Sequence, residues 1–170
     1  ILLPPQSQRV EHEAELAVVI GQRARWISPE EASGYILGYT AANDVTARDW
    51  QGAKPALAPG ERGDGQWLRA KGADTFLPIG PVFVTADEIP NPGELRLRSW
   101  RIPGSGPEAG ERVLMQDGTT ADMLYDIPAL IEFVSRAITL EPGDIISTGT
   151  PSGVGVYQDP PVFLQPGDRV

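Results

Sequence analysis

Two glutamates, Glu13 and Glu15, stand two residues apart at the start of an apolar run that ends at Ile20. In a β-strand, side chains two residues apart project from the same face, so an extended segment here turns both carboxylates to one side. Two carboxylates on one face repel each other unless a cation lies between them, and hard oxygen ligands suit Mg²⁺, Mn²⁺ or Ca²⁺. The alternative interpretation is a solvent-facing strand edge on which both glutamates are hydrated.

A third acid, Asp44, follows an apolar run and is expected at the end of a buried element, where a carboxylate needs a partner. Arg48 and Gln51 stand four and seven residues after Asp44. This is helical spacing, so the three side chains face one cavity if the segment turns helical there. Asp49 follows Arg48 directly and would point elsewhere, so we interpret it as an ion-pair or capping residue.

The charge of the chain limits its partners, because 23 acidic and 14 basic residues give a formal net charge of -9. A field of this sign repels phosphate backbones and anionic lipids, which argues against nucleic-acid and membrane partners. An anionic substrate then requires a local metal ion or placed Lys and Arg side chains. The sequence has no cysteine, which excludes disulfides, Cys-ligated zinc, iron–sulfur clusters and thiol nucleophiles.

The length of 170 residues and the hydrophobic content of 41% predict a single domain over residues 1–170. No stretch approaches the roughly 20 apolar residues that a membrane span requires, and the first residues lack the pattern of a signal peptide. We therefore expect a soluble cytoplasmic protein. The sequence begins without Met, and residues 166–170 look like a turn that leads into another strand, so we also expect flanking N- and C-terminal segments.

The elements that must position the acidic residues are short β-type runs, separated by many of the 19 Gly and 17 Pro residues. The strand candidates are residues 14–20, 81–84, 95–100 and 144–148. Two helices are predicted from their N-caps, one from Ser28 through residues 32–37 and one from Asp126 through residues 127–135. The pattern predicts a strand-rich fold with few helices.

Two stretches rich in Gly and Pro, residues 52–65 and 103–110, are predicted loops because neither could easily bury its backbone polar groups. The first loop lies between candidate site residues. It is either a mobile flap over a site or a plain surface insertion.

Four blocks of the sequence resemble motifs of the fumarylacetoacetate hydrolase family, including its acylpyruvase and 2-hydroxyhepta-2,4-diene-1,7-dioate isomerase members. They lie, in the family's order, at residues 12–21, 43–49, 69–75 and 148–155. Each block alone is weak evidence, but four in register span nearly the whole chain and make the match specific. The resemblance implies a mixed, β-rich α+β fold with a mixed β-sheet core and few short helices, packed as a homodimer.

By the same resemblance, a divalent cation is held by three carboxylates, which carry over to Glu13, Glu15 and Asp44. Mg²⁺ or Mn²⁺ is the ion that the family implies.

The resemblance also assigns contacts with a small anionic oxo-acid substrate to Arg48, Gln51, Lys71 and Thr150. A metal that chelates a 2-oxo acid polarises its carbonyl, and a nearby Lys71 ammonium would stabilise the enolate formed when the adjacent bond breaks. Without the resemblance, Lys71 is typical of a surface lysine, and the block around Thr150 is typical of a glycine-rich turn.

One feature departs from the hydrolytic members of the family, which activate water with a His and a Glu from an N-terminal segment. This sequence has no such segment, and its single histidine, His12, would lie on the strand face opposite Glu13 and Glu15. We interpret His12 as structural. Either a segment outside this sequence supplies the base, or the reaction needs no activated water. The loop between Gln51 and Lys71 is also longer than is usual in the family.

Three functions follow. The main hypothesis is a divalent-metal-dependent hydrolase that cleaves a C–C bond of an acylpyruvate-like or fumarylacetoacetate-like dioxo acid, in the breakdown of aromatic compounds. The second is an isomerase, tautomerase or decarboxylase of a related oxo acid, such as an unsaturated 2-hydroxy dicarboxylic acid or oxaloacetate. The third is a non-catalytic relative that keeps only the metal site.

Overall fold

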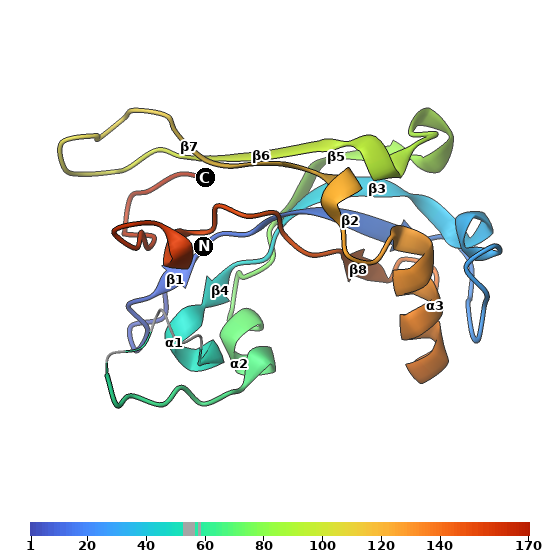
Figure 1. Ribbon diagram of the computed structural model, residues 1–170, viewed down its shortest axis with the longest axis horizontal. Coiled ribbons are helices and arrows are strands. Elements are labelled where there is room, and N and C mark those ends of the chain that lie inside the picture. Colours follow the sequence, from blue (N-terminus) through green and yellow to red (C-terminus); the bar gives the residue numbers. More distant parts are fainter. Residues whose placement is uncertain (53–56, 58) are drawn as a thin grey trace.

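The computed structural model describes residues 1–52, 57 and 59–170, and most of its regular structure is antiparallel β-strand (Figure 1). The strands are β1 Val10–Glu11, β2 Ala14–Ile20, β3 Ile36–Asn43, β4 Thr46–Ala47, β5 Ile79–Thr85, β6 Arg96–Arg101, β7 Val113–Thr119 and β8 Ile145–Ser147. The α-helices are α1 Arg48–Gln51, α2 Trp67–Lys71 and α3 Ile127–Ala137. Single 3-10 turns lie at Ala32–Tyr35, Ala86–Glu88, Pro92–Glu94, Thr120–Asp122 and Gly155–Tyr157. The predicted β-rich fold with few short helices is confirmed.

The main sheet has the strand order β5-β3-β2-β8, and each neighbouring pair is antiparallel. β1 pairs with β4, and β6 pairs with β7 in a separate ribbon. In Figure 1 the β6–β7 ribbon lies above the main sheet, and α1, α2 and α3 lie below it. β2 therefore runs through the middle of the molecule, with neighbours along both edges.

The core forms against one face of β2, because side chains alternate between the two faces of a strand. Leu16, Val18 and Ile20 are buried and pack with Ile127 and Ile131 of α3 in one cluster. Glu13 and Glu15 alternate with this set, so they project from the opposite face. The hydrophobic pattern of β2 thus fixes the direction of both carboxylates.

Four strand predictions and one helix prediction are confirmed, with ends that differ by at most two residues. The strands are β2, β5, β6 and β8. The helix is α3, where the Asp126 side chain accepts a hydrogen bond of 2.9 Å from the backbone N–H of Ala129. This bond is the predicted N-cap, and it satisfies one of the free N–H groups of the first turn.

The prediction of a helix over residues 32–37 is wrong, since only the 3-10 turn Ala32–Tyr35 forms and Ile36 begins β3. Pairing of β3 with both β2 and β5 outweighs the local helical signals. At Gly38 the backbone of β5 comes so close that only glycine fits. A Cβ at this position would collide with the carbonyl oxygen of Val84 on β5. Ser28 is not a side-chain N-cap; its backbone N–H instead donates to Glu31 at 2.9 Å.

The predicted loop 103–110 contains no helix or strand. In the predicted loop 52–65, residues 53–56 and 58 lie outside the described part of the chain, and the remainder has no helix or strand. Among the described residues, no helix has both the length and the apolar character needed to cross a membrane.

We predict that Ile131→Ala lowers the free energy of unfolding by about 2–5 kcal/mol, because it leaves a cavity between α3 and β2. Ile131 is fully buried, whereas Phe133, two residues further along α3, is 73% exposed. Chemical denaturation measures both effects, and Phe133→Ala is the control, expected to change little. Equal losses in the two variants would contradict this description of the core.

Candidate metal centre

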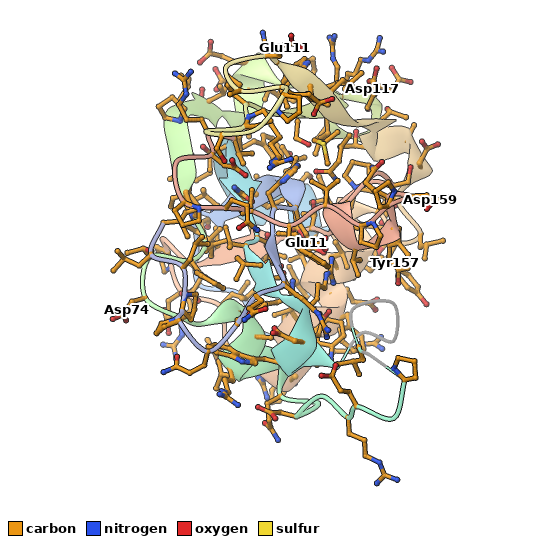
Figure 2. All side chains as sticks on the ribbon, turned by 90° about the vertical axis from the view of Figure 1, so that its left-hand side faces the viewer. Glu11, Asp74, Glu111, Asp117, Tyr157 and Asp159 are labelled. Carbon is orange, nitrogen blue, oxygen red and sulfur yellow. The ribbon has the colours of Figure 1, made fainter. Side chains whose placement is uncertain are left out.

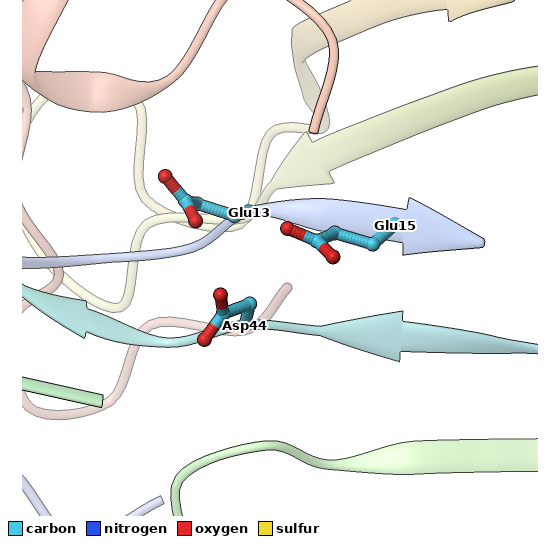
Figure 3. A group of neighbouring side chains, drawn as sticks. All are labelled: Glu13, Glu15 and Asp44. Carbon is cyan, nitrogen blue, oxygen red and sulfur yellow. The ribbon is translucent and has the colours of Figure 1, made fainter. Parts of the chain in front are cut away.

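The register of the main sheet brings three carboxylates together from two strands (Figure 3). Glu13 directly precedes β2, Glu15 lies in it, and Asp44 directly follows β3. Ala14 pairs with Asn43, and the N–H of Asp44 donates to the carbonyl oxygen of Glu13 at 2.9 Å. One oxygen from each of the three carboxylates lies within 4.8 Å of the others. The predicted ligand set is therefore close enough to share one ion.

Lys71, the last residue of α2, points its ammonium group into this cluster. Its Nζ lies 2.9 Å from Glu13 Oε2, 2.5 Å from Asp44 Oδ2 and 2.9 Å from Thr46 Oγ1. Burial opposes the charge of Lys71, but its hydrogen bonds and attraction to Asp44 and Glu13 outweigh this and raise its pKa. Lys71 therefore remains an ammonium between two candidate metal ligands.

Arg48, the first residue of α1, binds the cluster from the other side and is buried. Its guanidinium donates to Glu11 and to Glu13, and its third hydrogen bond, of 2.7 Å, goes to Gln51 Oε1. Gln51 is thus connected to the carboxylates through Arg48. Asp44 is not part of this helix, so the predicted helical spacing from Asp44 is wrong, although the side chains meet in one cluster as expected.

The described part of this cluster has an excess of negative charge. Four carboxylates, on Glu11, Glu13, Glu15 and Asp44, face two cationic side chains, which leaves two negative charges uncompensated. Burial raises the pKa of Glu15 and of Asp44, and the neighbouring carboxylates raise both further. A divalent cation would supply the missing charge, and hard oxygen ligands suit Mg²⁺ or Mn²⁺. The side chains present therefore fit the ion that the sequence predicted.

Glu15 is held from the side of β8. Its Oε2 accepts hydrogen bonds from the hydroxyl of Ser147 and from the backbone N–H of Gly149, the latter at 2.9 Å. Gly149 has a φ of 97°, a conformation that a residue with a Cβ rarely adopts. The glycine-rich turn noted in the sequence therefore orients a candidate metal ligand with its backbone.

Thr150 lies in the same turn, but its hydroxyl is engaged with protein groups. The hydroxyl donates to the carbonyl oxygen of Ala14 at 2.8 Å and accepts a bond of 2.7 Å from Gln116 Nε2. Thr150 also lines a cavity of about 300 Å³ between the β6–β7 ribbon and α3. The structure thus places Thr150 beside the strand that carries the carboxylates, and Glu13, Glu15, Asp44, Arg48, Gln51 and Lys71 in the connected cluster.

Two residues were assigned structural roles from the sequence. His12 is buried, its Nε2 lies 2.9 Å from Ser99 Oγ, and burial together with nearby Arg101 lowers its pKa to about 4. His12 is therefore a neutral histidine with a structural role. Asp49 accepts hydrogen bonds from the hydroxyl of Ser7 at 2.7 Å and the backbone N–H of Gln8 at 3.3 Å. Among the described residues Asp49 binds the N-terminal segment, and it forms neither the ion pair nor the helix cap that the sequence predicted.

Two buried residues of this region were not predicted from the sequence. Glu11 is 1% exposed and binds Arg48 and the backbone N–H of Val156; Figure 2 shows it in the interior, whereas Asp117 and Asp159 lie at the periphery. The alternation of Glu11 with Glu13 and Glu15 was the signal that could have found it. Gln116 is also 1% exposed. Nothing in its local sequence distinguishes it from a glutamine on an exposed hairpin.

An antiparallel sheet that carries a group of carboxylates and a lysine defines a candidate metal centre. The sequence matches the family described as fumarylacetoacetate (FAA) hydrolase C-terminal over residues 1–170, and the chain belongs to this family. The resemblance noted in the sequence is confirmed.

Relatives with assigned names include tautomerases and isomerases. The chain is 46% identical over 170 residues to a Bos taurus protein named oxaloacetate tautomerase FAHD2B, mitochondrial, and covers 49% of it. A solved structure of 5-carboxymethyl-2-hydroxymuconate delta-isomerase from Mycobacterium smegmatis is 42% identical, with a TM-score of 0.75, and the match covers 91% of this chain and 53% of that one. A fumarylacetoacetate hydrolase from Exiguobacterium antarcticum is 39% identical, with a TM-score of 0.79 and coverage of 96% and 52%.

The chain spans about half the length of the curated relatives it matches. The bovine relative carries the word mitochondrial in its name. The cytoplasmic location expected from the sequence stays a prediction.

We predict that Asp44→Asn abolishes the thermal stabilisation of the protein by Mn²⁺, because one of three charged ligands is lost. An ion present at 100 times its Kd stabilises the wild-type protein by about 2.7 kcal/mol through binding to the folded state alone. Thermal unfolding with and without Mn²⁺ measures the difference. Asp49→Asn, a few residues away and outside the cluster, should keep the shift. An unchanged shift in Asp44→Asn would remove this residue from the ligand set.

We predict that Glu15→Gln stabilises the metal-free protein at neutral pH. Because burial raises the pKa of Glu15, the stability it contributes is present below its unfolded pKa and is lost as pH rises through the folded one. The glutamine oxygen still accepts both hydrogen bonds but carries no charge. Melting temperatures in excess chelator across pH 4 to 8 should therefore fall less steeply than in wild type. Glu88→Gln, at an exposed residue, is the control; a steeper fall in Glu15→Gln would refute the assignment.

Proposed function

We propose that this chain forms the metal-binding active site of an isomerase that interconverts the keto and enol forms of a small 2-oxo dicarboxylic acid, with oxaloacetate as the first candidate. Two findings support the proposal. The bovine relative is named an oxaloacetate tautomerase, and the Mycobacterium smegmatis structure is named an isomerase. The alternative reaction class from the sequence analysis is thus better supported than the main hypothesis.

The position of Lys71 is the observation that carries the proposal. Its ammonium group lies within hydrogen-bonding distance of Glu13 and Asp44, at the candidate metal centre. In keto–enol exchange a proton leaves the carbon beside the carbonyl, the electron pair of that C–H bond becomes the C=C bond, the carbonyl π pair moves onto oxygen, and this oxygen takes up a proton from an acid. If Lys71 is that acid, the proton released from carbon restores its ammonium form, so the exchange is balanced. A held ammonium can stabilise the developing negative oxygen and deliver the proton.

Glu13, Glu15 and Asp44 are the residues that would hold Mg²⁺ or Mn²⁺, which when bound would polarise the substrate carbonyl. Arg48 orients Glu13 and keeps two of its five N–H groups outside the three named hydrogen bonds. These groups suit a substrate carboxylate. Contacts of Arg48, Gln51, Lys71 and Thr150 with the substrate are part of the proposal.

Hydrolysis of a C–C bond is the less supported reaction. It requires a base that activates water, and His12, which is buried against Ser99 with a lowered pKa, does not fit that role. Decarboxylation of an oxo acid uses the same enolate stabilisation and remains the neighbouring alternative. A role in the breakdown of aromatic compounds stays a prediction.

A homodimer, expected from the resemblance, remains part of the proposal. β5 is an edge strand of the main sheet. Its side chains Ile79, Val82 and Phe83 are 49%, 64% and 45% exposed. An exposed apolar edge strand is typical of a surface that is covered in an assembly.

The reaction is tested with the purified protein, supplied in turn with oxaloacetate and with an acylpyruvate, with Mg²⁺ or with excess chelator. Ultraviolet absorbance follows the enol, while separate assays follow pyruvate formation and cleavage of the acylpyruvate. We expect metal-dependent keto–enol exchange faster than either other reaction. Turnover that persists undiminished in chelator would sink the metal-dependent proposal, and acylpyruvate cleavage without keto–enol exchange would favour the hydrolase.

We predict that Lys71→Met lowers the rate of keto–enol exchange by about 10²–10⁴-fold, the usual contribution of a positioned acid–base group. Binding of Mn²⁺ should persist, because the ammonium shares two carboxylates with the ion. Arg136→Gln is the control for loss of a cation elsewhere, since Arg136 is exposed in the last turn of α3 and pairs with Glu132. A Lys71→Met variant with the wild-type rate would show that Lys71 takes no part in the reaction.

A further inference from the structure

The pairing of β2 with β8 ends just before it reaches the candidate metal centre. Ala17 pairs with Ser147, and the backbone N–H of Thr148 donates to the carbonyl oxygen of Leu16 at 3.2 Å. If this register continued, Thr150 would lie opposite Ala14. Gly149 instead turns the chain and gives its N–H to Glu15. The backbone of β2 between Glu13 and Glu15 therefore has no strand partner on the β8 side, while β3 still pairs with it on the other side.

Two side chains replace the missing strand at Ala14. The N–H of Ala14 donates to Gln116 Oε1 at 3.0 Å, and its carbonyl oxygen accepts from Thr150 Oγ1 at 2.8 Å. Both polar groups of the residue between the two glutamates are thus satisfied. A buried backbone group without such a partner would cost free energy comparable to a lost hydrogen bond.

The side-chain amide of Gln116 connects Ala14 of β2 with the turn that contains Thr150. Its Oε1 also accepts from the hydroxyl of Ser99 at 2.9 Å, and its Nε2 donates to Thr150 Oγ1 at 2.7 Å and to the carbonyl oxygen of Pro151 at 2.9 Å. A primary amide has two donor hydrogens and two acceptor lone pairs, so all four positions are used. The backbone N–H of Ala14 can only donate and the carbonyl of Pro151 can only accept, which fixes the orientation of the amide.

The network is anchored on the far side by His12. The single hydroxyl proton of Ser99 goes to Gln116 Oε1, so Ser99 Oγ accepts from His12 Nε2–H. Ser99 lies directly opposite Gln116 in the β6–β7 ribbon, and both are buried. The amide of Gln116 is therefore held by the β6–β7 ribbon, which is separate from both β2 and β8.

We propose that Gln116 is a positioning residue that fixes the backbone between Glu13 and Glu15 relative to the Gly149–Thr150 turn, and so sets the geometry of the metal ligands and of Thr150. This inference rests on the proposed function of the carboxylates as a metal centre. Gln116 contacts neither the ion nor the substrate. It acts through Ala14, whose neighbours in sequence are two ligands, and through Thr150.

The test measures Mn²⁺ affinity by electron paramagnetic resonance of the free ion, together with kcat and KM for oxaloacetate keto–enol exchange. Gln116→Met keeps the length of the side chain and removes all four hydrogen bonds. We expect the Kd for Mn²⁺ to rise about 10–100-fold, the usual effect of removing a group that orients a metal ligand. A fall in kcat should accompany it. Gln116→Asn, which keeps the amide on a shorter side chain, should show a smaller loss and decides the question if Gln116→Met does not fold.

The matched control is Gln158→Met. Gln158 Nε2 donates to the carbonyl oxygen of Gly153 at 2.9 Å, so it fastens the neighbouring chain without contact to β2. The Kd of the Gln158→Met variant for Mn²⁺ should equal that of the wild-type protein. Unchanged affinity in the folded Gln116 variants, or an equal loss in Gln158→Met, would overturn the proposal. If wild type binds Mn²⁺ and the Gln116 variants weaken it, while oxaloacetate is not converted, the positioning role stands and only the proposed reaction fails.

Discussion

The site depends on one constraint, which is that like charges must be held close together away from bulk water. The register between β2 and β3 places Glu13 and Glu15 beside Asp44. Burial, and after it repulsion between the carboxylates, raises the pKa of Glu15 and of Asp44, so the site without a cation favours protonation or separation of the strands. The surrounding groups offset this repulsion with cations and with hydrogen bonds from backbone and hydroxyl donors.

These compensating groups come from parts of the chain that are distant in sequence. Arg48 and Lys71 approach from α1 and α2, whereas Ser147 and Gly149 approach from the end of β8. The face of β2 that is turned away from the carboxylates packs on α3. One face of β2 therefore packs in the apolar core and the opposite face carries the charged site, because its side chains alternate.

The sequence predicted those parts of the structure that depend on local pattern. The apolar run from Ala14 to Ile20 indicated β2, the two-residue spacing of Glu13 and Glu15 indicated the shared direction of their carboxylates, and the Asp126 cap indicated α3. It failed at residues 36 and 37, where cross-strand pairing on both sides of β3 decides the conformation. The resemblance to a family, not spacing alone, brought Lys71 to the site, since no periodic rule links a lysine at the end of one helix to a distant strand.

Glu11 and Gln116 mark the limit of such reasoning. Glu11 continues the alternation of acidic residues, but only the fold reveals that it serves Arg48. Gln116 lies on a ribbon outside the main sheet, and its importance arises from a pairing that stops at Gly149. Tertiary contacts decide where a strand ends. A glutamine whose amide supplies the hydrogen bonds of the missing strand therefore has no local sequence signal.

The two helices that supply the cations also limit where the chain can change in length. Arg48 begins α1 and Lys71 ends α2, and Arg69 of α2 stacks on Trp50 of α1 at 4.3 Å. The segment that joins these helices is thus tied down at both of its ends by contacts that do not depend on its own length. A longer connection would cost little entropy, since the penalty for a longer loop grows only slowly. Length can therefore be added between the two cations without moving either of them.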